Sequence, residues 1–78
     1  MMRRMSHPVR DVPITGAPIR LGQFLKLAGL AEDGAHAKDL IEAEEVAVNG
    51  EIETRRGRQL TEGDVVAVGG EQGRVTTG

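Results

Sequence analysis

The feature that most constrains this chain is a change of hydrophobic period near residue 46. Up to that point apolar residues recur at spacings of three and four, which predicts short amphipathic helices. Beyond it they alternate with polar residues, which predicts strands. Seventy-eight residues are enough for one domain, and a single Phe with no Trp or Tyr leaves the core to aliphatic side chains. The pattern therefore predicts helices followed by strands in one small domain.

The first helix is expected directly after Pro18. Leu21, Phe24, Leu25 and Ala28 fall on one helical face, which would be buried. Gly29 is expected to end this helix.

A second helix is expected after a loop over residues 31–34. Asp33 is a candidate N-terminal cap, and the apolar residues of the helix are Ala37, Leu40 and Ile41. Acids oppose the helix dipole at the carboxyl end, so that end should fray. The acids there are Glu42, Glu44 and Glu45.

The strand region begins with Val46 and Val48, followed by Asn49-Gly50, a pair that favours a tight hairpin turn with positive φ. The returning strand would run through Ile52 and Thr54. Leu60 should re-enter the core. Residues 61–64 predict a turn, residues 65–68 a further strand, and residues 74–76 a short last one.

Residues 1–17 contain Pro8, Pro13 and Gly16 and are expected to be mostly a flexible tail, with a short edge strand near residues 12–15. Residues 18–78 would then form the domain. The chain has no Cys and no apolar run near the roughly 20 residues of a membrane span. We therefore expect a cytoplasmic protein without disulfides or a secretory signal.

Charge is unevenly distributed. The formal net charge is −2, with an excess of positive charge in residues 1–20, a strong excess of acids in residues 21–54 and a slight positive excess in residues 55–78. Because salt screens each charge beyond about 8 Å, an acidic chain can still present a local basic patch.

Catalytic chemistry is not indicated. The bases available are His7, in the expected tail, and His36, which we interpret first as a solvated helix residue. Two His residues do not supply a metal site, and Gly69-Gly70 lacks the Lys-Ser/Thr ending of a phosphate loop. We expect no enzyme activity, no metal and no cofactor.

Arg55, Arg56 and Arg58 place three guanidinium groups within four residues, a pattern suited to phosphate oxygens. The alternative is an ordinary solvated loop in which these arginines pair with carboxylates. The candidate carboxylates are Glu51, Glu53 and Glu62.

Five segments in order resemble the S-four RNA-binding domain family, named after a small-subunit ribosomal protein. They are residues 19–25, Gly29-Leu30, residues 37–41, residues 46–50 and residues 63–66. The amino-acid sequence of residues 21–27 and 53–58 is most similar to a subgroup of this family, small bacterial proteins in which the domain stands alone. The core motif would span residues 19–68.

The resemblance implies an α+β fold with two short helices packed on a small, mostly antiparallel sheet, the αL RNA-binding motif. It implies binding of structured RNA, ribosomal or transfer RNA, with the ribosome or an assembly intermediate as partner and neither DNA nor membrane. The candidate RNA-binding residues carried over by position are Arg20, Lys26, His36, Lys38, Asn49, Arg55, Arg56 and Arg58. For Asn49 a structural role in the turn is the favoured interpretation.

The sequence departs from ribosomal-type members at Gly22, where they have an acid, and at Gly34-Ala35-His36, where they have a Ser-Arg opening. Strong, ribosomal-protein-like affinity is therefore not carried over.

Two alternatives stay open. Residues 48–51 and 60–66 also resemble small sulfur carriers, which need a terminal Gly-Gly, whereas this sequence ends in Thr76-Thr77-Gly78. The acids of the second helix could instead serve a protein-interaction module.

Overall fold

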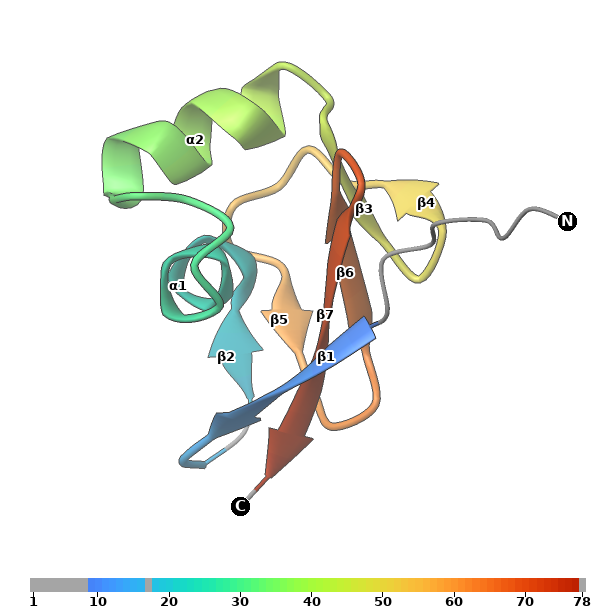
Figure 1. Ribbon diagram of the computed structural model, residues 1–78. Helices are drawn as coiled ribbons and strands as arrows, with labels where there is room; N and C mark the ends of the chain where they lie inside the picture. The colour runs from blue at the N-terminus through green and yellow to red at the C-terminus, as the bar shows by residue number, and fades with distance from the viewer. Residues whose placement is uncertain (1–8, 17, 78) are drawn as a thin grey trace, which may run out of the picture.

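The computed structural model describes residues 9–16 and 18–77 (Figure 1). Two helices lie between a first pair of strands and five later ones. In chain order the elements are β1 (Val9–Ile14), β2 (Ile19–Arg20), α1 (Leu21–Leu27), α2 (Gly34–Glu42), β3 (Val46–Val48), β4 (Glu51–Ile52), β5 (Gln59–Leu60), β6 (Val65–Val68) and β7 (Glu71–Thr77).

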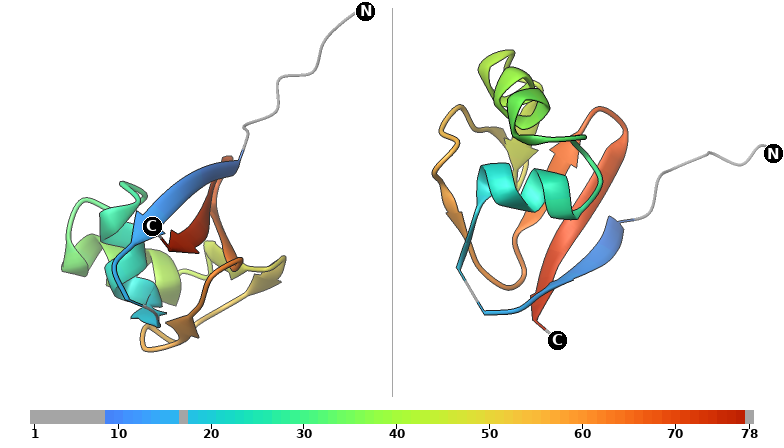
Figure 2. Two further views of the ribbon diagram at one scale, coloured as in Figure 1. Left: turned by 90° about the horizontal axis from the view of Figure 1, so that it is seen from below. Right: turned by 90° about the vertical axis from the view of Figure 1, so that its left-hand side faces the viewer.

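The main sheet has five strands in the order β1-β7-β6-β3-β4. All its neighbours are antiparallel except β1 and β7, which run parallel. Strands β2 and β5 form a separate antiparallel ribbon. Both helices lie on one side of the main sheet, with α2 above α1 (Figures 1 and 2). The α+β class with two helices on a mostly antiparallel sheet is confirmed.

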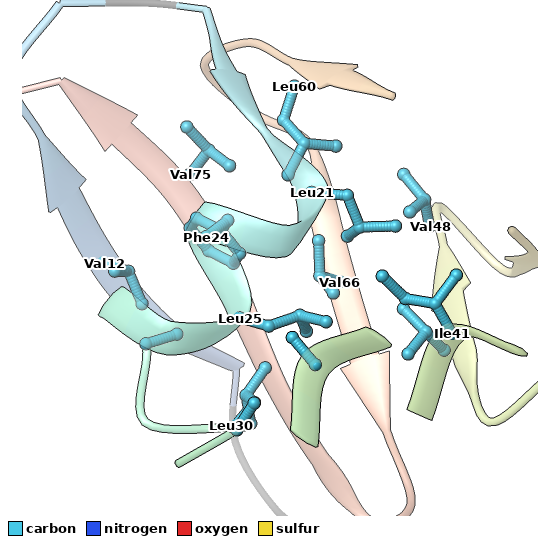
Figure 3. Packing of buried hydrophobic residues seen from close by; sticks show 14 of the residues in the cluster. Val12, Leu21, Phe24, Leu25, Leu30, Ile41, Val48, Leu60, Val66 and Val75 are labelled. Carbon is cyan, nitrogen blue, oxygen red and sulfur yellow. The ribbon is translucent and has the colours of Figure 1, made fainter. Parts of the chain in front are cut away.

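The core lies between α1, α2 and the sheet (Figure 3). Leu21, Phe24, Leu25 and Ala28 are all buried, so the predicted apolar face of the first helix is confirmed. Ala37 and Ile41 are buried from the second helix, and Leu40 packs partly buried against them. The sheet contributes Val12, Ile14, Val46, Val48, Val66 and Val75, and the ribbon contributes Leu60.

Both helices end in the same hydrogen-bonded geometry. After α1, Gly29 has φ +76°, its N–H donates to the Lys26 carbonyl, and the Leu30 N–H donates to the Leu25 carbonyl. After α2, Glu44 takes the equivalent position at φ +61°. Such a cap needs a residue with positive φ, which Gly adopts without strain and Glu does not. The predicted stop at Gly29 is confirmed.

The start of α2 and the hairpin turn also follow the sequence. The Asp33 side chain accepts a hydrogen bond from the backbone N–H of His36 at 2.8 Å, which confirms the predicted cap. Asn49 and Gly50 both have positive φ, 54° and 87°, as a tight hairpin requires. The returning strand is shorter than predicted, because β4 ends at Ile52 and Thr54 lies outside it.

The amino-terminal strand corrects one expectation. Residues 9–14 form β1 rather than part of a flexible tail, because Val12 and Ile14 are buried and all six residues pair with β7. The edge strand expected near residues 12–15 therefore starts earlier and ends at Ile14. The expectation of a flexible tail over residues 1–8 lies outside the described residues. The last strand, expected at residues 74–76, covers Glu71–Thr77 because it pairs with both β6 and β1.

Neither helix in the described part of the chain is long and apolar enough to cross a membrane.

Candidate nucleic-acid interface

The loop with three arginines, residues 55–58, connects β4 to β5 and is docked on the start of α1. A turn closes the loop, in which the Arg58 N–H donates to the Arg55 carbonyl at 3.2 Å. The carbonyls of Arg58 and Arg56 then accept the N–H groups of Leu21 and Gly22 at 2.8 and 3.2 Å. The first N–H groups of a helix have no partner inside the helix. Since α1 has no side-chain cap, the backbone of the arginine loop serves as its cap.

This docking brings further basic residues to the arginine loop. Arg20 is exposed and pairs with Gln59 in the β2–β5 ribbon, directly beside the loop. Lys26 lies one helical turn from Gly22 on the same face of α1, because residues four apart are neighbours on a helix. The side view shows the loop rising next to the first turn of α1, with α2 above it (Figure 2, right). Arg20 and the arginine loop thus lie at the amino-terminal end of α1, and Lys26 lies in its last turn, one turn further along the same face.

An open depression runs along α1, from the residues before its first turn to its last turn. It is lined by Ile19, Gln23, Lys26 and Leu27, and Leu27 is 54% exposed. Its walls are aliphatic apart from the amide of Gln23 and the ammonium group of Lys26.

Glu53, two residues before the arginine loop, is the one charged side chain that is buried among the described residues. Its Oε2 accepts hydrogen bonds from the backbone N–H and the Nε of Arg55, both at 3.0 Å. Its Oε1 accepts from Nη2 of Arg55 at 3.2 Å and from Nη1 of Arg58 at 2.9 Å. These four bonds occupy the roughly four lone-pair sites that a carboxylate offers.

The hydrogen bonds from Arg55 and Arg58 lower the pKa of Glu53 from 4.5 to about 2. Burial acts in the opposite direction but is the weaker effect. The same pairing raises the pKa of Arg55 above its usual value. Glu53 therefore remains a carboxylate at neutral pH, held between two guanidinium groups.

This arrangement bears on both interpretations of the arginine triplet. The solvated-loop alternative named Glu53 as a partner, and two of the three arginines do pair with it. Arg56 is exposed and makes no ion pair among the described residues. One carboxylate against three guanidinium groups leaves an excess of two positive charges, and the side chain of Arg55 is still 74% exposed. The loop stays basic, although less so than three free arginines would be.

The candidates on the second helix have local partners. The Nδ1 of His36 accepts a hydrogen bond from the backbone N–H of Glu32 at 3.0 Å, so its ring belongs to the cap of α2. Lys38 lies 4.0 Å from Glu42, with both side chains at least half exposed. Such exposed pairs within a helix contribute only about 0.3–0.5 kcal/mol to stability. A phosphate could therefore replace Glu42 as the partner of Lys38 at little cost.

Asn49 is held in the protein by three hydrogen bonds. Its Nδ2 donates to Asp64 at 3.1 Å, its Oδ1 accepts from the Val65 N–H at 3.0 Å, and its own N–H donates to the Val65 carbonyl at 2.7 Å. These bonds tie the hairpin turn to the turn before β6. They support the structural interpretation of Asn49.

Sequence reasoning missed the contacts that attach β1. Nη2 of Arg10 donates to the carbonyl of Ala28 at 2.7 Å, at the end of α1. Arg74 on β7 binds Asp11 on β1 at 2.8 Å. No local sequence signal marks these pairs, because their partners are 18 and 63 residues apart.

Within residues 9–16 and 18–77, no three or more His, Cys, Asp or Glu side chains gather in a way that could hold a metal ion. His7 lies outside the described residues.

Fold and site together define a class: a small α+β domain in which a helix pair and a basic loop share one surface. The chain belongs to the S4 domain family, whose model matches residues 12–76. This range contains the core motif expected over residues 19–68 and extends it to β1 and β7.

Two relatives are informative. The chain is 52% identical over 52 residues to a probable ribosome maturation protein, RlbA, of Bacillus subtilis (strain 168), covering 67% of this chain and 73% of the relative. It is 33% identical to YbcJ from E. coli, with a TM-score of 0.69 over 99% of this chain and 98% of YbcJ. The solution structure of YbcJ is described as revealing an αL motif involved in RNA binding.

Proposed function

We propose that this chain is a non-catalytic module that binds structured RNA through the surface formed by α1, the arginine loop and the β2–β5 ribbon. The family assignment and the αL motif of YbcJ support this role. The relationship to a probable ribosome maturation protein supports a ribosome-related setting. The RNA would be ribosomal or transfer RNA, met in the cytoplasm on the ribosome or an assembly intermediate.

One observation carries the proposal: the backbone of the arginine loop caps α1. The loop is thereby fixed to the helix that carries Lys26 and to the ribbon that carries Arg20. Basic side chains from three elements thus form one surface on a chain whose net charge is −2.

The chemistry of this surface suits RNA backbones. Double-stranded RNA is recognised mainly through its shape, its phosphates and its 2′-hydroxyl groups. Arg56 has all five guanidinium N–H donors available for phosphate oxygens, as far as the described residues show. Arg20 and Lys26 would extend the contact along α1, while His36 and Lys38 would add a weaker one from α2.

The proposal is tested by comparing two variants that each remove one exposed arginine. Arg56→Ala removes a proposed phosphate contact, whereas Arg74→Ala removes an arginine from β7, near the opposite edge of the main sheet. Binding of a labelled RNA hairpin is measured by fluorescence anisotropy at about 0.15 M salt, with a DNA duplex of the same sequence as a second ligand.

We expect Arg56→Ala to weaken RNA binding about fivefold, the contribution of one released counterion at this salt concentration. We expect Arg74→Ala to change it less than twofold, and the DNA duplex to bind more weakly than the RNA. Equal effects of the two substitutions would contradict the proposed surface.

The sulfur-carrier alternative is not favoured, because the family match covers residues 12–76 and includes both helices. The protein-interaction alternative is likewise not favoured, because the family match and the αL motif of YbcJ both support RNA binding.

A further inference from the structure

Glu53 is a buried acid bonded to two arginines of a surface proposed to bind a polyanion. Burying a carboxylate is costly unless it is paired and hydrogen-bonded, and Glu53 meets both conditions through Arg55 and Arg58. Its side chain is 8% exposed, against 74% for Arg55 and 31% for Arg58. The carboxylate is therefore covered while both guanidinium groups still reach the solvent.

The two guanidinium groups keep most of their donors. Of five N–H donors each, Arg55 uses two on Glu53 and Arg58 uses one. Within residues 9–16 and 18–77, the other three donors of Arg55 and four of Arg58 have no hydrogen-bond partner. Because both groups bind the same carboxylate within 3.2 Å, these remaining donors are held close to one another and in a fixed orientation.

We propose that Glu53 is a positioning residue for RNA binding, which holds Arg55 and Arg58 as one preformed site for a backbone phosphate. This inference rests on the proposed function. Ordering a free arginine on binding lowers affinity about three- to tenfold, and here that ordering is already present before RNA arrives. Glu53 thus strengthens RNA binding although its own charge repels RNA.

The inference predicts that removing Glu53 weakens RNA binding, whereas charge alone predicts that removing an acid strengthens it. Removing an acid near a bound phosphate should tighten binding up to about twofold, through the loss of screened repulsion. Glu51 provides the matched control, because it is an exposed acid on the adjoining strand β4 with no ion pair among the described residues. Glu51→Gln should tighten binding slightly, whereas Glu53→Gln should weaken it about three- to tenfold.

A purely structural role of Glu53, such as holding the backbone of the loop through the Arg55 N–H, is distinguished by a double-mutant cycle. If Glu53 acts through the two guanidinium groups, Glu53→Gln should weaken binding in the wild-type chain. In the Arg55→Ala, Arg58→Ala background it should instead tighten binding up to about twofold. A structural role predicts weaker binding in both backgrounds.

The experiment measures hairpin-RNA affinity of the full chain for the wild type, Glu51→Gln, Glu53→Gln, the double arginine variant and the triple variant, with folding checked by circular dichroism under assay conditions. The inference is supported if Glu53→Gln weakens RNA binding in the wild-type chain and tightens it in the double arginine variant. Loss of affinity in both backgrounds, or Glu53→Gln behaving like Glu51→Gln, overturns it while leaving RNA binding intact. Absence of RNA binding by the wild type overturns the proposed function and the inference with it.

A measurement on the wild type keeps the test decisive if a variant does not fold. The Nε–H signal of Arg55 in a ¹⁵N NMR spectrum should exchange slowly with water, both free and with RNA bound, because Glu53 keeps its hydrogen bond. Loss of that protection on RNA binding would show that phosphate displaces Glu53, which overturns the inference.

Discussion

Replacing Glu53 with Gln should lower the free energy of unfolding by about 1–2 kcal/mol at pH 7 and by almost nothing at pH 2. The pKa of Glu53 falls from 4.5 to about 2 in the folded chain, mainly through its hydrogen bonds with Arg55 and Arg58. A depression of this size corresponds to roughly 3 kcal/mol. Because both arginines reach the solvent, screening reduces the contribution to about 1–2 kcal/mol.

The direction with pH follows from the lowered pKa. The stabilisation is complete above pH 4.5, where the carboxylate is charged in both the folded and the unfolded chain. It is lost as the pH falls from 4.5 towards 2, where the folded chain also binds the proton. Gln does not titrate, so the difference between the wild type and Glu53→Gln isolates this one group from the other carboxylates.

The assay is urea unfolding followed by circular dichroism, since the chain has no Trp or Tyr for fluorescence. Unfolding is measured at intervals between pH 7 and pH 2 for the wild type, Glu53→Gln and the exposed control Glu51→Gln. The control should stay within about 0.5 kcal/mol of the wild type throughout. A Glu53→Gln difference that is absent at pH 7, or that does not shrink between pH 4.5 and 2, would refute the reasoning.

Three further substitutions test the packing and the caps, each by thermal or urea unfolding. Gly73→Ala should destabilise by about 1–3 kcal/mol, because its Cβ would lie 3.3 Å from Val12 and 3.5 Å from Phe24 in a packed core; no loss would show that this contact can relax. Glu44→Gly should stabilise by up to about 1 kcal/mol, since it removes positive-φ strain at the end of α2, and a lower melting temperature would contradict this. Asp33→Ala should cost about 1 kcal/mol through loss of the α2 cap, whereas an unchanged stability would mean that water replaces the cap.

Local features of the fold could be predicted because local sequence encodes them. The spacing of Leu21, Phe24 and Leu25 fixes the buried face of α1, since any other face would expose them. Asn49-Gly50 fixes the hairpin turn through its tolerance of positive φ.

The rest depended on contacts between distant residues. The parallel pairing of β1 with β7 joins the two ends of the chain, and neither strand's sequence identifies its partner. The sequence offered Glu51, Glu53 and Glu62 as partners for the arginines, and only the structure, through burial and the bonds to Arg55 and Arg58, distinguishes Glu53 from the other two. The arginine loop caps α1 with backbone carbonyls. Because every residue carries a backbone carbonyl, this cap cannot be predicted from residue types.

The salt dependence of RNA binding tests the central claim most directly, because it counts the phosphates that the basic surface neutralises. With four or five phosphate contacts, log K for a structured RNA should fall with log salt at a slope of about −3 to −4.5. Replacing all three arginines of the loop with Ala should bring the slope about two units nearer zero, one for the phosphate bound by Arg56 and one for the phosphate shared by Arg55 and Arg58. A slope near zero for the wild type, or an unchanged slope in the variant that lacks all three loop arginines, would contradict RNA binding by this surface.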